Sequence, residues 1–494
     1  MIEIRRHDRH TSTVDSVGAA GARPATRHRW WALSFLVTGN LTVFTAVTTM
    51  NVAIPQAQAA LGFSDSTRAA VLTLYSLCFG TFMLLGGRLA DVLGLRRCLS
   101  TGLIGFAIAS ALGGFASSVH FLLIARAFQG ITGALVAASG LAMISVMFPG
   151  GRERVRAFGL YGMVMGMGTA ASFTVAGALV VAASWRWVMF INIPLALIVT
   201  LGVIGFAPAL PAARGSRLRI GSAALITAAL GLLVVGLDQA GTNGWGHGPA
   251  GALLGAAAIV LAGFVVVMRR SQDPLIPLFL FGERRRLSAF CAVFLIGIGV
   301  FAGMFMLTSV LQDVLGYTPL RTGAAFLPWG LAAIVGARAL GAVKTRVPVD
   351  VTLAAGMLMV AAAIASLALL TSGTTYLTGI LPAMLLLGAG STAVMVTGTS
   401  TATMNVGEHN GVAGALVNAS QQVGAAVGTA LLAAIITSTL QSELTSGRSE
   451  GAMITAYATA SGVGAVLIAV GALGVVALSR IAPRSPSPAR PRRS

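Results

Sequence analysis

The residues best suited to chemistry lie in one apolar stretch, 122–135, where Arg126 places a permanent positive charge in a segment otherwise able to cross a bilayer. On an α-helix, Gln129, Gly130 and Gly133 follow Arg126 at i+3, i+4 and i+7, so a guanidinium, an amide and two small residues share one face. An arginine near the bilayer centre costs about 2.5–3.5 kcal/mol on insertion scales, so it should face protein or water. We therefore expect Arg126 and Gln129 to have a function.

A second group of residues has types that could line a path for a ligand. Polar residues interrupt the apolar stretch 31–53, and three amides lie at i, i+3 and i+4 on the stretch 411–437, where a helix would bring them to one face. Two methionines and a tryptophan in other apolar stretches add adaptable and stacking surfaces. The candidate cavity residues are Asn40, Thr48, Asn51, Met163, Met167, Trp329, Asn418, Gln421 and Gln422. Helix packing and interhelical hydrogen bonds use the same residue types, so both interpretations stay open.

Titratable and metal-binding groups are scarce inside the apolar stretches. None of the 14 Asp and Glu residues falls in the interior of one. Cys78, Cys98 and Cys291 lie in or at the ends of apolar stretches, so we predict neither a disulfide framework nor a metal site. Since we find no G-x-x-x-x-G-K-[ST] motif outside the apolar stretches and no catalytic cluster, we expect no cofactor, no catalytic residue and no ATP-driven pump.

The elements that must position these residues are long apolar helices. The chain has 494 residues, of which 56% are hydrophobic and 10% charged, and this composition excludes a soluble protein with one or two packed cores. About fourteen apolar stretches are long enough to cross the ~30 Å hydrocarbon layer as helices. They are 31–53, 68–87, 98–117, 120–146, 157–182, 186–207, 220–238, 250–268, 288–312, 322–342, 351–371, 375–400, 411–437 and 454–478. We predict an all-α polytopic membrane protein.

The formal net charge of +19 indicates an orientation in the membrane better than it indicates a nucleic-acid partner. The basic residues are scattered through short loops, so nucleic-acid binding is not expected. With the N-terminus in the cytoplasm, 28 of the 33 Lys and Arg residues fall in cytoplasmic segments and four fall outside, which predicts that both termini are cytoplasmic. Residues 1–30 are then a cytoplasmic extension without a cleavable signal, and 479–494 are a cytoplasmic tail.

The loop between the second and third apolar stretches has residues that could act as a latch. Gly87 permits close helix approach and Gly94 permits a tight turn, while Asp91 can pair with a basic group such as Arg96 or Arg97 or cap a neighbouring helix. We expect these five residues to form a conformational latch on the cytoplasmic side. Their pattern resembles the G-x-L-A-D-r-x-G-r-k signature of the major facilitator superfamily, with apolar residues at two of its basic positions.

Three further motifs carry this resemblance. Arg126, Gln129 and Gly130 match the superfamily's R-x-x-Q-G motif, whose arginine is associated with proton coupling. Residues 184–194, SWRWVMFINIP, are similar to the S-W-R-W-x-F-x-I-N-x-P segment of its 14-helix drug:proton antiporters, and residues 311–323 resemble the loop after their ninth helix. The resemblance implies export of hydrophobic drugs or antibiotics from a bacterial cytoplasm by alternating access, in exchange for protons.

The resemblance also implies an architecture and a set of partners. Two six-helix sets, 31–207 and 288–478, would flank two inserted helices in 220–268, and 269–287 would be a cytoplasmic linker. We expect a monomer in the bacterial cytoplasmic membrane, with a small hydrophobic or cationic drug, protons and membrane lipids as its partners.

Two departures from the antiporter pattern leave the coupling open. Ser172 and Phe173 stand where the antiporters have Gly-Pro, and Ala46 stands where they have an acid. The residues expected to act in proton coupling or transport are Arg126, Gln129 and Asp91. Without the acid, a substrate-specific facilitator or an exporter coupled in another way is the alternative. A membrane enzyme or receptor would need a catalytic cluster or a folded extramembrane domain, and no loop is long enough for one.

Overall fold

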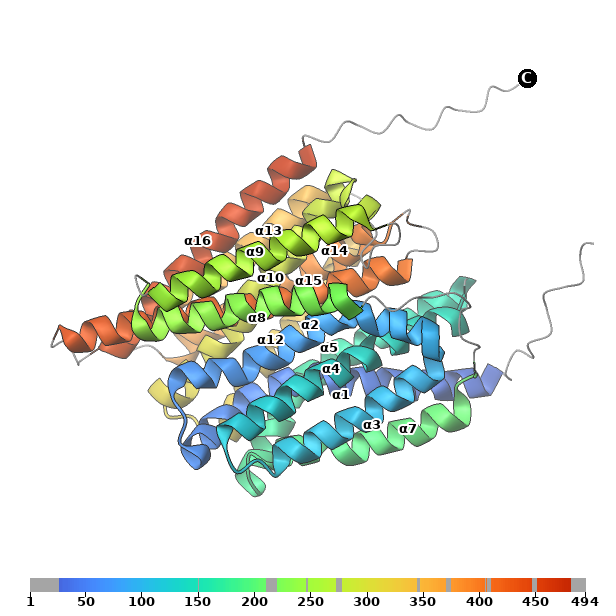
Figure 1. The fold of residues 1–494 in the computed structure, drawn as a ribbon, viewed down its shortest axis with the longest axis horizontal. Coiled ribbons are helices and arrows are strands. Elements are labelled where there is room, and N and C mark those ends of the chain that lie inside the picture. Colours follow the sequence, from blue (N-terminus) through green and yellow to red (C-terminus); the bar gives the residue numbers. More distant parts are fainter. Residues whose placement is uncertain are drawn as a thin grey trace, which may run out of the picture.

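The computed structural model describes residues 26–149, 151–209, 220–245, 248–271, 278–343, 347–369, 375–404, 406, 410–446 and 451–480. Over these ranges it is helical and has no strand, which confirms the predicted all-α class (Figure 1). The first helices are α1 Thr26–Leu61, α2 Asp65–Leu93, α3 Leu95–Gly114, α4 Val119–Met147, α5 Gly151–Ala182, α6 Trp187–Phe190, α7 Asn192–Phe206, α8 Ile220–Asn243 and α9 Gly248–Arg270. They are followed by η1 Leu278–Phe281, α10 Arg284–Ser309, η2 Val310–Val314, α11 Pro319–Ala325, α12 Leu327–Val343, α13 Val349–Leu367, η3 Tyr376–Ile380, α14 Leu381–Ala402, α15 Asn410–Thr445 and α16 Ala452–Arg480.

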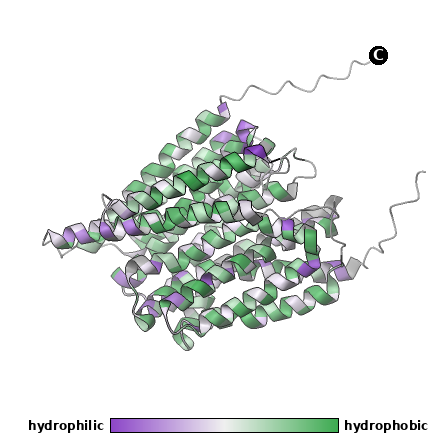
Figure 2. Ribbon diagram, in the orientation of Figure 1, coloured by the Kyte–Doolittle hydropathy of each residue, from purple (hydrophilic) through white to green (hydrophobic). Residues whose placement is uncertain are grey.

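Most of the long helices are apolar enough to cross a membrane. Twelve helical segments of the described chain combine the required length with an apolar composition. Figure 2 shows hydrophobic residues along the helices and hydrophilic residues mainly near their ends. The two remaining predicted stretches, 68–87 and 157–182, fall on α2 and α5, which are helices of 29 and 32 residues. The polytopic membrane class is confirmed, while the count of fourteen spanning helices stays a prediction.

The first helix is longer than the sequence predicted. We expected its apolar stretch to end at residue 53, but α1 continues through Pro55 to Leu61. A proline in a helix removes one backbone hydrogen bond. Ala53, Ile54 and Ala57 are fully buried around Pro55, so packing against other helices maintains α1 across this point.

Two sets of helices lie side by side, with a pair of helices along the seam between them. In Figure 1, α1–α7 form the lower set and α10–α16 the upper set. Between them, α8 packs on both α2 and α15 as well as on α9. The start of α1 lies at the right of this view and the end of α16 at its top. We name the end of the two helix sets at which these two lie the termini end, and the opposite end is the distal end.

The apolar cores show where the two sets join. One core lies mainly within the lower set towards the termini end, where it includes Leu36, Phe106 and Val136, and it also takes in Ala419 of α15. A second core fills the upper set and continues, without interruption, into the distal parts of α1, α2 and α5, where it includes Ile54 and Phe173. The two sets therefore share a buried apolar core at the distal end.

Candidate functional site

Small residues on α4 allow it to pack closely against α1 and α2. Its N-terminus is capped by Ser118, whose Oγ accepts a hydrogen bond of 3.3 Å from the backbone N–H of Phe121. A Cβ atom added at Gly130 would lie 2.5 Å from the carbonyl oxygen of Tyr75, and one added at Gly133 would lie 2.8 Å from a methyl group of Val43. The strip of small residues therefore places the Arg126 face of α4 directly on its neighbours.

Arg126 lies wholly inside the lower set and joins three helices. Its side chain has no exposed surface, and its guanidinium carbon lies 4.4 Å from the ring centroid of Tyr75 on α2. Nε donates to the carbonyl oxygen of Val71 on α2 at 3.2 Å, and Nη1 donates to the carbonyl oxygen of Ala46 on α1 at 3.3 Å and to Oε1 of Gln129 at 2.7 Å. Nη2 is buried and has no partner among the described residues. The cation is held by neutral groups and an aromatic face.

Gln129 extends this network to α3. Its Nε2 donates to Oγ of Ser110 at 2.8 Å and lies 3.8 Å from the sulfur of Met189. The hydroxyl of Tyr75 donates to the carbonyl oxygen of Val43 on α1 at 2.7 Å. Four helices of the lower set are therefore connected through the side chains of Arg126, Gln129 and Tyr75, so a displacement of one of them changes buried polar contacts of the others.

The position that lacks the expected acid lies next to Arg126. Ala46 is 3% exposed, and its carbonyl oxygen is one of the acceptors of the guanidinium. In this chain the methyl group of Ala46 leaves the cation without a negative partner among the described residues, so these residues do not form an arginine–carboxylate pair here.

The predicted latch is only partly built as expected. Gly94 has a φ of 85° and is the single residue between α2 and α3, so the tight turn depends on it. Close helix approach occurs at Gly86, where an added Cβ would lie 3.1 Å from the carbonyl oxygen of Ala134; at Gly87 it would meet no atom within 4 Å. The close helix approach expected at Gly87 therefore occurs at Gly86, while the latch function of Gly87 stays a prediction.

The basic residues of the latch show one contact between helices. Arg96 donates to the carbonyl oxygen of Ala207, at the end of α7, at a distance of 3.4 Å, and Arg97 is exposed. The side chain of Asp91 lies outside the described part of the structure. The latch function of these residues stays a prediction.

The predicted cavity residues of α1 are buried within or next to the lower set. Nδ2 of Asn40 donates to the carbonyl oxygen of Leu36 at 2.9 Å, and its side chain packs on Gly140 of α4. Thr48 shares a hydrogen bond of 2.8 Å with Ser172 on α5, and Asn51 donates to the carbonyl oxygen of Val47 at 3.1 Å. The hydrogen bonds of Asn40 and Asn51 stay within α1, whereas Thr48, through Ser172, and Asn40, through Gly140, join α1 to a neighbouring helix, which is the alternative we left open.

The remaining predicted cavity residues lie nearer the other set. Trp329 on α12 meets Phe173 of α5 edge to face at 6.2 Å between ring centroids, and its Nε1 has no partner among the described residues. Gln422 is buried where α15 packs on Gly80 of α2, whereas Asn418 and Gln421 are half-buried. The side chains of Met163 and Met167 lie outside the described part. The structure therefore does not bring the predicted cavity residues together with Arg126.

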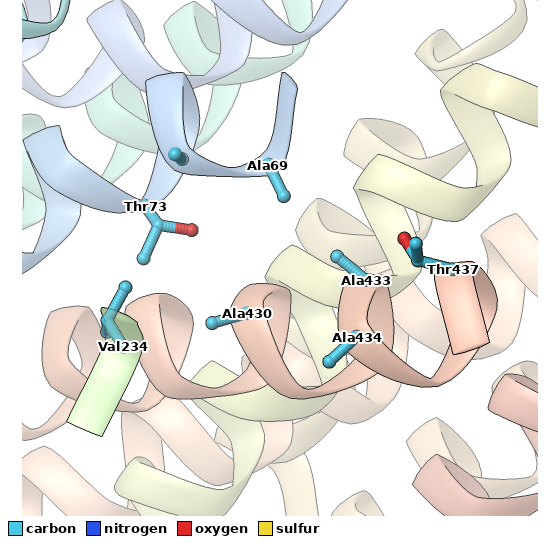
Figure 3. Close-up of a pocket in the computed structure, with 8 residues that line it drawn as sticks. Ala69, Thr73, Val234, Ala430, Ala433, Ala434 and Thr437 are labelled. Atoms are coloured by element: carbon cyan, nitrogen blue, oxygen red, sulfur yellow. The ribbon is translucent and has the colours of Figure 1, made fainter. Parts of the chain in front are cut away.

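A pocket between α2, α8 and α15 has a different lining from the one we predicted. Its walls are small and mostly apolar (Figure 3). They consist of Ala69, Ala70, Thr73, Val234, Ala430, Ala433, Ala434 and Thr437. It lies on the seam between the two sets, and none of the predicted cavity residues lines it.

Contacts between the two sets at the distal end were not found from the sequence. Phe173 stacks on Phe326 with ring centroids 4.2 Å apart, and Oγ1 of Thr174 donates to the carbonyl oxygen of Gly323 at 3.3 Å. Arg68 and Asp313 form an ion pair across the sets. Asp313 falls in the 311–323 motif, but its partner lies 245 residues earlier, a pairing that only the packed helices reveal. In the sequence, the only indication of these contacts was that Ser172 and Phe173 stand in place of Gly-Pro.

Comparison with known proteins identifies the class and then the family. The apolar helices and the packing of two sets define a multi-pass membrane transporter, because residues 36–429 match the family model of the Major Facilitator Superfamily. The chain belongs to the major facilitator superfamily. It is 39% identical over 428 residues to the puromycin resistance protein of Streptomyces alboniger, covering 85% of this chain and 84% of that protein.

Other relatives and solved structures agree with this family. The chain is 33% identical over 421 residues to a cephamycin export protein of Amycolatopsis lactamdurans, covering 84% of this chain and 86% of that one. It is 31% identical to the tetracenomycin C resistance and export protein of Streptomyces glaucescens, over 84% of this chain and 78% of that one. An auto-inhibited peptide transporter of the POT family shares the fold with a TM-score of 0.67 at 16% identity, covering 94% of this chain and 99% of that one.

Proposed function

We propose that this chain exports a small hydrophobic or cationic antibiotic across the bacterial cytoplasmic membrane, as a monomer, by alternating access and in exchange for protons. The observation that carries the proposal is the similarity, over more than four fifths of the chain, to proteins whose names state antibiotic resistance or export. Puromycin, cephamycins and tetracenomycin C are therefore the first substrates to test.

The positive-inside bias supports an orientation for this function. With both termini in the cytoplasm, the termini end faces the cytoplasm and the distal end faces outward. The shared core and the contact of Phe173 with Phe326 then close the outward end, which is the arrangement of an exporter ready to take its substrate from the cytoplasm.

The surroundings of Arg126 support a role in transmitting movement. Its three hydrogen bonds reach α1, α2 and Gln129, so a change in the spacing of these helices alters the contacts of a buried cation. We propose that proton uptake uses an acid elsewhere in the chain, and Asp91 is our first candidate.

A facilitator is the second candidate function, and Ala46 is the observation that favours it. Without a carboxylate beside Arg126, the described residues of this network contain no titratable acid that could exchange protons between the two faces. A facilitator would move the drug only down its gradient.

Transport in proteoliposomes distinguishes the two candidates. Purified protein is reconstituted, a pH gradient is imposed, and the uptake of radiolabelled puromycin, cephamycin C and tetracenomycin C is followed against empty vesicles. An antiporter accumulates at least one drug uphill, and an ionophore that collapses the gradient stops this. A facilitator equilibrates the drug with or without the gradient. No protein-dependent flux of any of the three would contradict their choice as substrates.

A further inference from the structure

An ion pair joins the two sets at the distal end. Nη1 of Arg68, near the start of α2, lies 2.9 Å from Oδ2 of Asp313 on η2. The side chain of Arg68 is 6% exposed and that of Asp313 is 31% exposed, so the cation is buried while its carboxylate partner reaches water. The guanidinium also lies 5.7 Å from the ring centroid of Phe305 on α10.

A local change in the helix aims Asp313 at the other set. Residues Val310–Val314 form a π-helical turn at the end of α10, and such turns are frequent at functional sites. Within it, Nε2 of Gln312 donates to the carbonyl oxygen of Val52 on α1 at 3.3 Å, while the next residue, Asp313, pairs with Arg68 on α2. Two consecutive side chains of one set thus bind the other set.

Backbone-to-backbone packing seals the same end beside the ion pair. A Cβ atom added at Gly177 of α5 would lie 2.4 Å from the carbonyl oxygen of Pro319, and one added at Gly323 of α11 would lie 2.3 Å from that of Phe173. Thr322, between these contacts, has no exposed surface. The distal contact is therefore closed along α5 and α11 as well as at the ion pair.

Three other ion pairs respond differently to a movement of the sets. Each of them lies at the termini end and joins two residues of one set. They are Arg29–Glu153 in the lower set, and Arg286–Glu283 and Arg480–Asp350 in the upper set. When the sets rotate against each other, these pairs keep their partners, whereas Arg68 and Asp313 must separate.

We propose that Arg68 and Asp313 hold the distal end of the transport path closed and separate each time that end opens. The inference rests on the proposed alternating access, but not on the substrate or on proton coupling. Nε and Nη2 of Arg68 are buried without partners among the described residues, so Asp313 supplies the counter-charge of this cation. Removing that charge leaves a buried, unpaired guanidinium in the closed state and favours the state in which Arg68 reaches water.

Cysteine labelling measures the opening directly. Cys78, Cys98 and Cys291 are replaced by alanine, and Thr322→Cys places a reporter in the buried distal contact. In proteoliposomes without substrate or gradient, we expect Asp313→Asn to raise the rate at which a membrane-impermeant maleimide labels residue 322 by about tenfold, since Arg68 is buried and loses its counter-charge. Asp350→Asn is the matched control, because it breaks an ion pair within one set, and it should leave the rate unchanged.

A double variant shows whether Asp313 acts through Arg68. Arg68→Gln combined with Asp313→Asn leaves no buried charge in the closed state, so its labelling rate should fall back towards that of the parent protein. Parent-like labelling of Asp313→Asn, equal labelling of the single and double variants, or equal acceleration by Asp350→Asn would each overturn the proposal. Because no substrate or gradient is present, these results are independent of the export assay.

Discussion

Replacing Arg126 by lysine and by methionine separates its charge from its hydrogen bonds. Lysine keeps the charge but has one nitrogen, which cannot occupy the positions of both Nε and Nη1. Of the three hydrogen bonds, Nη1 makes those to Ala46 and Gln129 and Nε makes that to Val71, so at least one is lost. Hydrogen bonds of charged groups contribute about 1.5–3 kcal/mol each, so Arg126→Lys should destabilise the fold by at least about 1.5–3 kcal/mol.

Methionine should cost no more stability than lysine, although it removes the charge. The two carbonyl groups lie within helices and keep their helical hydrogen bonds, so Oε1 of Gln129 is the acceptor that loses its described donor, at about 1–3 kcal/mol. Methionine is similar in length to arginine, and it leaves no unpaired buried charge that would oppose folding. Arg126→Met should therefore be at least as stable as Arg126→Lys but inactive in export, and Arg126→Ala should also insert into the membrane and fail to export.

Melting temperatures of the purified variants in detergent give the order of stability, and drug export from vesicles gives activity at matched amounts of inserted protein. A lysine variant that melts at the parent temperature would show that the fork of hydrogen bonds is not what holds α1, α2 and α4 together. Normal export by the methionine or alanine variant would refute a role for the cation.

Three other substitutions test neighbouring parts of the structure. Ala46→Asp introduces a carboxylate on a residue whose carbonyl already accepts from Arg126, so we expect a steeper dependence of drug accumulation on the pH gradient in proteoliposomes; an unchanged dependence would argue against this position as a coupling site. Gly94→Ala forces a side chain onto a φ of 85° and should cost about 1–3 kcal/mol, seen as a lower melting temperature, whereas Gly87→Ala meets no atom within 4 Å and should melt like the parent. Asp91→Asn should slow the interconversion of inward- and outward-facing states, and equal turnover in vesicles would count against the latch.

The sequence predicted features that depend on a single helix. Spacing placed Arg126 and Gln129 on one face of α4, and the cost of a charge in the membrane predicted that this face is buried; the structure shows both. The turn at Gly94 was also predicted, because glycine adopts a positive φ without steric cost.

Features that depend on how helices pack could not be predicted. The acceptors of Arg126 on Val71 and Ala46 lie 55 and 80 residues away along the chain, and backbone carbonyls have no signature in residue types. Successive residues of a helix are rotated by about 100°, so Gly86 and Gly87 point in different directions. The motif in the loop does not indicate which of the two points at the neighbouring helix, and in the structure it is Gly86. The polar types of Asn40, Thr48 and Asn51 suggested a cavity wall. In the structure all three are buried among neighbouring helices, and residue type alone does not predict this burial.

The small side chains along α2 and α15 have a thermodynamic consequence. The walls shown in Figure 3 are mainly methyl groups, from Ala69 and Ala70 on α2 and from Ala430, Ala433 and Ala434 on α15. Alanine has no side-chain rotamers to order, so bringing such surfaces together loses almost no side-chain entropy and separating them recovers almost none. Along these pocket walls, a relative movement of α2 and α15 is therefore nearly free of the rotamer-ordering barrier that long interdigitating side chains would impose.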